Sequence, residues 1–592
     1  TLATRVPKAT DIIEHNLLSY DLTVSQPCAW LRNHNSASNM ASEQSPLLNS
    51  RDDADDRKRP VRSHGIRELG LFVWALLATA AVIVLAVYLQ HQNQVRHAHD
   101  KPAAKRNLVF MVSDGMGPAS LSLTRSYRQH VEGLSEGDTL TLDKHFWGSS
   151  RTRSSNSLVT DSAAGATAFA CGKKSYNGAI SVLPNYEPCG TVLEAAKKAG
   201  YMTGLVATTL VTDATPATFA SHVLLRQMED DIALQEIGEG VLGRSVDLIL
   251  GGGRCSFLPN TTEGSCRLDD VDVTKLAQEK HGWSYTDTRA GFDALDGGDK
   301  ADLPVLGLYA PADIPFELDR RNANDVYPSL SEMAQTALRA LEKATAKSDK
   351  GFFIMIEGSR IDHAGHFNDP AAQVHEVLEY DKTFQAVLDF IEQSDTETVL
   401  VATSDHETGG LATALQEPGH LPVYAWYPKV LANSTASAAH LASKLHRYVE
   451  SLPSPLTASA KEQLRTWINE ELVVSGLGIP NASDTELDLL VENSIDATYL
   501  LSAMISLRAH IGWTTHGHTA VDVNVYSSGG PGTERIRGNI ENTDIGKFLR
   551  EYLDVDVEEI TKKLRDGLDL GSIDDATALE LEQQPRIPVK AF

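Results

Sequence analysis

The sequence predicts an α/β fold: a large, mostly parallel central sheet with helices on both faces, preceded by one transmembrane helix. From about residue 104 onward, short apolar runs alternate with helical patterns, which is typical of parallel strands joined by helices. Acidic residues and histidines follow several of these runs, and in such sheets ligand sites form beyond the carboxyl ends of the strands. Upstream of them, a stretch of 21 residues carries no charge.

The uncharged stretch is LGLFVWALLATAAVIVLAVYL, residues 69–89, and a helix of that length spans a bilayer. Five basic residues precede it closely, whereas two occupy the matching window after it. Because cytosolic flanks carry the excess of Lys and Arg, we expect a single-pass type II protein with a cytosolic N-terminus. Residues 90–103 are then a linker, and the chain that follows lies in a lumen or outside the cell.

The chain before the span divides at Met40. Residues 1–39 show no clear pattern, and we interpret them as an extension of the gene model. Residues 40–68 form a cytosolic tail in which Glu43 stands four positions before the pair Leu47 and Leu48. This spacing is typical of an acidic dileucine signal, which a sorting adaptor would bind. An ordinary disordered tail is the alternative interpretation.

The composition is that of a globular protein, with 42% hydrophobic and 22% charged residues. The net charge of −26 argues against nucleic-acid binding, which needs basic surface. The chain after the span carries three glycosylation sequons, at Asn260, Asn433 and Asn481, and four of the five cysteines, Cys171, Cys189, Cys255 and Cys266. An even number of cysteines in an oxidising compartment predicts two disulfides, for which three pairings are possible. The segment CSFLPNTTEGSC indicates a loop closed by a disulfide between its own two cysteines.

Five short apolar runs are the clearest strands, as expected for buried ones: LVFMV (108–112), TGLVAT (203–208), DLILG (247–251), FFIMI (352–356) and TVLVAT (398–403). Helices are expected between them. The segment SLSEMAQTALRALEKATAK has Ser329 and Glu332 at capping-box spacing. The segment TVLEAAKKAG ends in Gly200, a C-terminal cap.

Four of these strands are followed by residues that can ligate metals: Asp114; Asp213 and Thr215; Glu357, Asp362, His363 and His366; and Asp405 with His406. Asp362 and His366 are four apart, so one helical turn places them on the same face. Carboxylate plus imidazole suits Zn²⁺, whereas the oxygen-only set of Asp114, Thr215 and Glu357 suits Mg²⁺. A solvated acidic rim is the alternative for any one of these residues.

Ser162, in VTDSAAGATAFACG (159–172), stands at the start of a helix of small residues. It can be a helix cap, or a nucleophile aided by the helix dipole. A serine hydroxyl needs a base or a metal to become nucleophilic, and no histidine lies near it in sequence. A zinc ion at the strand ends would lower the pKa of the hydroxyl and supply that activation.

In combination these motifs resemble the alkaline phosphatase family, in particular its fungal vacuolar, membrane-anchored type. The resemblance covers about residues 104–550 and rests on SDGMG (113–117), VTDSAAGATA (159–168), TDATPATFASHVLLR (212–226), DLILGGGR (247–254), IEGSRIDHAGH (356–366), TSDHETGG (403–410) and HGHTAVDV (516–523). It implies an alkaline-phosphatase-like sheet, two Zn²⁺ and one Mg²⁺. It also implies a catalytic domain in the vacuole lumen.

Carried over by position, Ser162 is similar to the serine that becomes phosphorylated, Arg226 to the arginine that grips the phosphate and Asp161 to the carboxylate that orients this arginine. Asp405, His406 and Asp114 resemble ligands of the activating zinc, with Asp114 bridging to the magnesium site of Thr215 and Glu357. Asp362, His366 and a late histidine resemble ligands of the second zinc. His518 and His516 both fit the late position, and the Asp522-Val523 pair four residues on favours His518.

Two positions depart from the sequence patterns of the best-known members of this family. Asp213, behind the magnesium site, matches the bacterial residue, whereas His363 matches the animal one, so the identity of the third metal stays open. The family also implies a variable insertion, here about 410–515, that acts as a cap or dimer contact in a homodimer. Residues 551–592 read as an acidic C-terminal tail.

The implied function is hydrolysis of small phosphate monoesters through a phosphoserine. One alternative is a metal-dependent phosphodiesterase or pyrophosphatase of the same superfold, which typically uses threonine and lacks this arginine. The other is a non-catalytic membrane glycoprotein that binds metal or phosphate, which would require the loss of a catalytic group.

Overall fold

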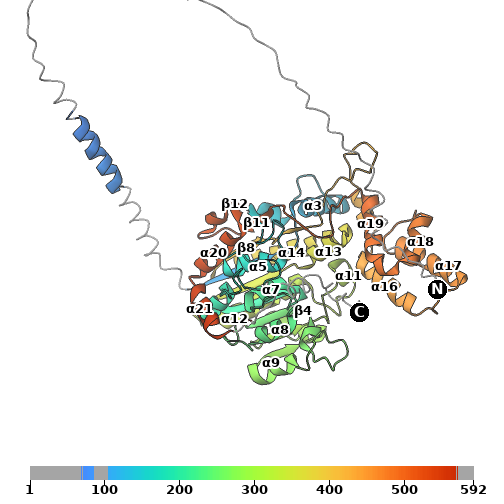
Figure 1. Cartoon of the computed structure of the whole chain (residues 1–592), viewed down its shortest axis with the longest axis horizontal. Helices are drawn as coiled ribbons and strands as arrows, with labels where there is room; N and C mark the ends of the chain where they lie inside the picture. Colours follow the sequence, from blue (N-terminus) through green and yellow to red (C-terminus); the bar gives the residue numbers. More distant parts are fainter. Residues whose placement is uncertain (1–68, 70, 86–104, 569, 571–592) are drawn as a thin grey trace, which may run out of the picture. The chain divides into compact units, whose positions relative to one another are not determined.

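The computed structural model describes residues 69, 71–85, 105–568 and 570 (Figure 1). The chain divides into two units, residues 1–97 and 98–592. In the first, residues 69 and 71–85 are helical, and apolar side chains such as Trp74 are mostly exposed. Among the described residues, no helix has both the length and the apolar character needed to cross a membrane. Residues 86–89 of the expected span, the linker 90–103, and Glu43, Leu47 and Leu48 lie outside the described residues, as does segment 1–39.

The second unit is built on a ten-stranded sheet in the order β12-β2-β11-β8-β1-β7-β3-β4-β6-β5. Its strands are β1 (Arg106–Val112), β2 (Phe146–Arg151), β3 (Met202–Leu210), β4 (Leu248–Gly252), β5 (Ser284–Thr286), β6 (Val305–Leu308), β7 (Phe352–Glu357), β8 (Glu397–Thr403), β11 (Val523–Ser527) and β12 (Gly538–Glu541).

The five strands expected from the sequence are all present, and they lie side by side as β8-β1-β7-β3-β4, each parallel to its neighbours in this set. The sheet as a whole is mixed, because β11 runs antiparallel to both β8 and β2. The carboxyl ends of β8, β1, β7 and β3 therefore meet at one edge, as the ligand-bearing loops require.

Helices cover both faces of the sheet because its central strands are apolar on both sides. Leu108 and Phe110 of β1 pack into one core cluster, and Val109 and Met111 pack into another on the opposite face. The first face carries α5 (Ser162–Cys171), α6 (Val192–Lys198), α7 (Ala214–Ala220) and α20 (Asn542–Leu553). The second carries α3 (Pro118–Glu132), α12 (Leu330–Thr345) and α14 (Pro370–Gln393).

Local signals set the helix ends as expected. Ser329 caps α12 in a capping box with Glu332. Gly200, two residues beyond the end of α6, adopts φ 93, which a glycine tolerates. The remaining shorter helices of the sheet domain are α4 (Thr141–Lys144), α8 (Glu229–Ile237), α9 (Val273–His281), α10 (Arg289–Asp293), α11 (Glu317–Arg320) and α13 (Arg360–Phe367).

The expected insertion forms a helical lobe. The chain enters it through β9 (Glu407–Thr408) and leaves through β10 (His518–Thr519), which pair antiparallel with His518 opposite Thr408. Leu441, Leu464 and Leu501 help to form its core. Its helices are α15 (Pro428–Ala432), α16 (Ala438–Glu450), α17 (Ala458–Trp467), α18 (Asp484–Glu492) and α19 (Ala497–Ala509), of which α16 to α19 gather at one side of the sheet domain (Figure 1).

The disulfides and the C-terminal segment can also be compared with what the sequence predicts. Cys171 is bonded to Cys189, and Cys255 to Cys266, so CSFLPNTTEGSC does close its own loop. Residues 551–567, assigned from sequence to the acidic tail, finish α20 and form α21 (Val557–Gly567). The apolar side chains of α21 recur at helical spacing and are buried beside α6: Val557, Ile560 and Leu564.

Candidate active site

Ser162 is the first residue of α5, and Asp161 caps this helix: its carboxylate accepts a hydrogen bond from Ala164 N at 3.0 Å. The interpretation of Ser162 as the cap is therefore wrong. The Ser162 side chain is almost fully buried, and its Oγ lies 3.2 Å from Nε2 of His406. Ser162 thus has the histidine contact that its local sequence does not supply.

The structure gathers the predicted ligands into two groups. Asp114, Asp405 and His406 form one, and Asp362, His406 and His518 form the other, with ligand atoms within 4.8 Å of one another in each group. His366 adjoins the second group, since its Nε2 lies 3.2 Å from Asp362 Oδ2. Gly115 permits this convergence: its φ is 74, and a Cβ there would lie 2.5 Å from Asp362 Cα.

Three histidines turn the same ring nitrogen towards the centre. His518 Nδ1 faces the carbonyl of Thr160 at 2.9 Å, and His366 Nδ1 faces the carbonyl of His516, so each Nδ1 must donate. Thr408 gives its single hydroxyl proton to Asp362, so Nδ1 of His406, 3.2 Å from Thr408 Oγ1, donates to that hydroxyl. In its neutral form each of these rings therefore presents an unprotonated Nε2 to the site, which is the form that binds a metal.

His516 has a different place from His518. It is exposed, and its Nδ1 lies 2.9 Å from the carbonyl oxygen of His366. The backbone carbonyl of His516 in turn accepts from His366 Nδ1. His516 therefore orients His366, whereas the ring of His518 stacks on that of His406 with centroids 3.5 Å apart. The second ligand group therefore contains His518 and not His516.

Glu357 and Thr215, two members of the expected oxygen-only set, are buried. Glu357 ends β7 and accepts a hydrogen bond from Ser359 Oγ at 2.7 Å. Thr215 is buried in the first turn of α7, which Asp213 caps through Ala214 N. Burial raises the pKa of Glu357 to about 8, with the charges of Asp213 and Asp405 adding to the effect and the Ser359 bond opposing it.

Crowding of carboxylates dominates the electrostatics. Burial raises the pKa of Asp114 well above its usual range, and the charges of Asp405 and Asp362 raise it further. For Asp362 burial acts in the same direction, but His366 and His518 outweigh it and lower the pKa well below its usual range. Burial and the charge of His406 lower the pKa of His518 to about 3, so its ring is neutral.

These residues fit a set of divalent cations. Within the described part of the chain, neither Asp114 Oδ1 nor Asp405 Oδ2 receives a hydrogen bond, although both are buried. The Nε2 atoms of His366 and His518 are 3.1 Å apart, so when both rings are neutral with protonated Nδ1 their lone pairs repel unless a proton or a metal cation lies between them. Both observations are explained by cations coordinated at the strand ends.

Arg226 lies beside Asp161, the residue that caps α5. Its Nη2 is 2.6 Å from Asp213 Oδ1, and its Nη1 is 3.5 Å from Asp161 Oδ2. Burial disfavours the charged guanidinium, but the two carboxylates outweigh this effect and raise the pKa of Arg226. The Arg226 backbone N donates to Gly178 O, and Gly178 N donates to Asp161, which fixes the arginine relative to Ser162.

His363 does not join the metal-ligand groups. Its Nδ1 lies 3.2 Å from Oδ2 of Asp313, which also faces the guanidinium of Arg360 at 3.6 Å. Burial would raise the pKa of Asp313, but the charge of Arg360 and the contact with His363 outweigh it and lower the pKa. Asp313 follows β6 and carries no local motif, so sequence reasoning missed it. Thr408 was missed as well, although it lies inside the TSDHETGG motif.

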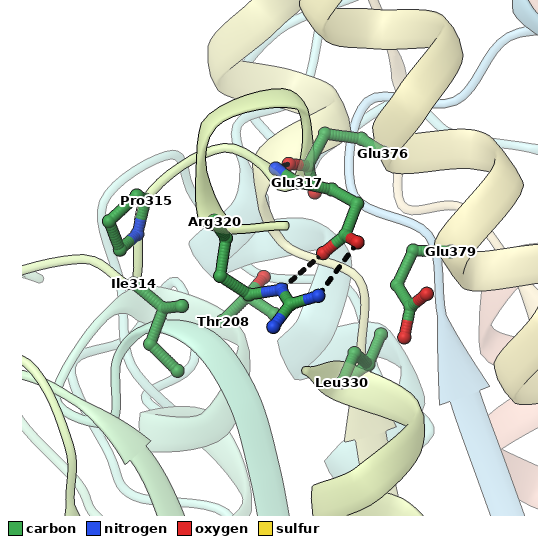
Figure 2. Close-up of a pocket in the computed structure, with 8 residues that line it drawn as sticks. All are labelled: Thr208, Ile314, Pro315, Glu317, Arg320, Leu330, Glu376 and Glu379. Atoms are coloured by element: carbon green, nitrogen blue, oxygen red, sulfur yellow. Dashed lines mark hydrogen bonds and ion pairs between the residues drawn. The ribbon is translucent and has the colours of Figure 1, made fainter. Parts of the chain in front are cut away.

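A small pocket is lined by other residues and does not include Ser162. Figure 2 shows Arg320 paired with Glu317, next to Glu376 and Glu379. Thr208 lines the same pocket, and its Oγ1 accepts a hydrogen bond from the backbone N of Ser359, the residue that donates to Glu357. The pocket contains none of the predicted site residues, so we assign it a supporting role only.

Comparison with known proteins identifies a matching family model, similar sequences and a similar solved structure. The sequence model of the alkaline phosphatase family matches residues 105–555. The chain is 48% identical to the repressible alkaline phosphatase of Saccharomyces cerevisiae, over 92% of this chain and 97% of that protein. It is 44% identical to an alkaline phosphatase of Schizosaccharomyces pombe, over 93% and 98%. A cold-active alkaline phosphatase structure from Shewanella sp. superposes with a TM-score of 0.61 at 31% identity, covering 76% of this chain and 99% of that one.

Proposed function

The chain belongs to the alkaline phosphatase family of phosphomonoesterases, and on this premise we propose that it hydrolyses phosphate monoesters through a phosphoserine formed on Ser162. The contact between Ser162 Oγ and His406 Nε2 carries the proposal, because it places the hydroxyl within the ligand groups and beside Asp161 and Arg226. The products are inorganic phosphate and an alcohol.

We propose that Asp114, Asp405 and His406 hold one Zn²⁺, and that Asp362, His366 and His518 hold a second. Asp114, Thr215 and Glu357 would hold Mg²⁺, because oxygen donors suit it. When bound, the cations lower the pKa of the serine hydroxyl and offset negative charge as it moves between the attacking and leaving oxygens. The orphaned oxygens of Asp114 and Asp405 support this assignment.

The protein groups would act in two displacements. Ser162 Oγ attacks phosphorus as the alcohol oxygen departs on the opposite side, and water then attacks the phosphoserine to release phosphate and restore the hydroxyl. Arg226 binds the equatorial phosphate oxygens, for which its planar donors are suited. Asp161 and Asp213 hold the guanidinium in place.

Ser162 with Arg226 favours monoesters over the diesters and pyrophosphates of the alternative function, since the arginine would pair with an oxygen that a diester esterifies. Hydrolysis of phenyl phosphate and of bis(phenyl) phosphate by the full-length protein tests this directly. EDTA should abolish the monoesterase activity, and Zn²⁺ plus Mg²⁺ should restore it. Faster diester turnover, or active protein without zinc by elemental analysis, would contradict the proposal.

We further propose that residues 69–89 anchor the protein in the vacuole membrane, with the catalytic domain lumenal, and that the enzyme is a homodimer. Support for the anchor comes from the uncharged stretch, the basic flank and the exposed apolar side chains of residues 71–85. Protease added to sealed vacuoles should remove a tag at Met40 and spare the catalytic domain until detergent is added. A protected tag would contradict this topology, and light scattering measures the oligomeric state.

A further inference from the structure

A continuous row of aromatic side chains runs from Ser162 to the surface. His406 contacts Ser162, the His518 ring stacks on His406, and His366 Nε2 lies 3.1 Å from His518 Nε2. His516 exchanges two hydrogen bonds with His366, and its ring centroid is 4.8 Å from that of Tyr499. Tyr499 belongs to α19, so the helical lobe supplies the outer end of the row.

From His406 outward, exposure increases along this row, which identifies the direction in which the site opens. Ser162 is 3% exposed and His406 is fully buried, whereas the side chains of His518 and His366 are 12% and 33% exposed. Tyr499 is 44% exposed, and one edge is fixed by Phe367, whose ring centroid is 6.0 Å away.

The direction matters because an in-line displacement places the leaving oxygen opposite the attacking one. With Ser162 at the buried end of the row, the alcohol must point towards the open end, past His366 and along His516 and Tyr499. A half-exposed tyrosine ring held by two aromatic neighbours offers an apolar face to a planar group.

We propose that Tyr499 and His516 form the subsite for the alcohol part of the substrate and favour aromatic over small aliphatic phosphate monoesters. The inference rests on the proposed function. Because inorganic phosphate has no alcohol part, its binding should not depend on this subsite.

The test compares kcat/KM for phenyl phosphate and ethyl phosphate in the full-length enzyme. Tyr499→Ala should lower the phenyl-to-ethyl ratio about 2- to 10-fold, the range expected for one aromatic contact, and Tyr499→Phe should retain it. Leu507→Ala is the matched control, since Leu507 is an exposed apolar residue on the same helix. The inhibition constant of phosphate should be unchanged in all three variants.

An unchanged ratio in Tyr499→Ala would overturn the subsite. An equal loss on both substrates with weaker phosphate inhibition would also overturn it, because Tyr499 would then support the metal ligands rather than contact the alcohol. Should Tyr499→Ala fail to fold, Tyr499→Leu replaces the ring with an apolar side chain. Failure of the wild-type enzyme on both esters would instead refute the proposed function.

Discussion

Ser162 Oγ lies 3.2 Å from His406 Nε2, and the proton on the other nitrogen of His406 is fixed by Thr408. Among the hydrogen bonds of the described residues, the one that places a hydroxyl against His406 Nε2 comes from Ser162. We therefore expect Ser162→Ala to lose activity by roughly 10³-fold or more. The variant should stay folded, because Asp161 caps the helix. Trapping with radiolabelled phosphate is the measurement, and covalent label on the Ala variant would show that another group is the nucleophile.

Asp161 both caps α5 and holds Arg226, so its variants should affect stability and phosphate binding together. Asp161→Ala should lower the free energy of unfolding by about 1 kcal/mol from the lost cap. Asp161→Asn, which retains one acceptor, should be intermediate. Asp272 caps α9 through Lys275 N and is the control: Asp272→Ala should cost similar stability without changing phosphate inhibition. Equal phosphate inhibition in all variants would separate Asp161 from the site.

Arg226→Ala should weaken phosphate inhibition by roughly 10- to 100-fold, as expected for lost hydrogen bonds to a charged group. Arg226→Lys should recover part of this loss, because it restores the charge but not the paired planar donors. Inhibition constants are measured alongside circular dichroism. A folded Ala variant with the wild-type inhibition constant would rule out contact with phosphate.

His222 should stabilise the protein more at neutral than at alkaline pH. Its Nε2 lies 2.7 Å from Glu194 Oε1 and its Nδ1 3.2 Å from the carbonyl of Ser181, so both nitrogens donate and the buried ring is charged. Burial alone would lower the pKa of His222, but Glu194 outweighs it and raises the pKa. A raised folded-state pKa gives stability that is complete below about pH 6.5 and is lost as pH rises through the folded-state value.

The measurement is the difference in Tm between wild type and His222→Gln, which should be largest near pH 6 and shrink towards pH 9. His281→Gln is the control, because His281 pairs with Glu239 nearer the surface, where water weakens the interaction. A difference for His222→Gln that stays constant over this range would show that its ring is neutral.

The two disulfides should differ in their effect on activity. They close loops with sequence separations of 18 and 11, and loss of either should cost about 3 kcal/mol. Cys171 ends α5, the helix that begins at Ser162, so the double variant Cys171→Ser, Cys189→Ser should also lower kcat. The variant Cys255→Ser, Cys266→Ser should keep kcat at temperatures where it remains folded. Equal effects on kcat would contradict this distinction.

The sequence predicts the centre of the fold well and its margins poorly. The central strands are apolar on both faces, so a run such as FFIMI identifies β7 directly. In contrast, β12 has the sequence GNIE and β5 has three residues, and neither length nor pattern marks them. The antiparallel direction of β11 depends on its partners and has no local signal.

The candidate site divides in the same way. Asp114 and Asp405 could be predicted because each stands two residues after the end of a recognisable strand. Asp313 could not, since its partner His363 is 50 residues away and only the tertiary fold brings them together. His516 and Thr160 orient His366 and His518 through their backbone carbonyl oxygens. Every residue has such a carbonyl, so a sequence motif cannot identify these contacts.

Because β9 and β10 pair with each other, the geometry of the candidate site does not depend on the length of the lobe between them. His518 is paired with Thr408 across this ribbon, so its position is set by that register whatever the intervening chain does. The entropy of closing a loop rises only slowly with its length. Evolution could therefore lengthen, shorten or replace the lobe, and with it Tyr499, while the hydrolytic chemistry stays the same. Substrate range and catalytic power can thus be inherited as separate parts of one enzyme.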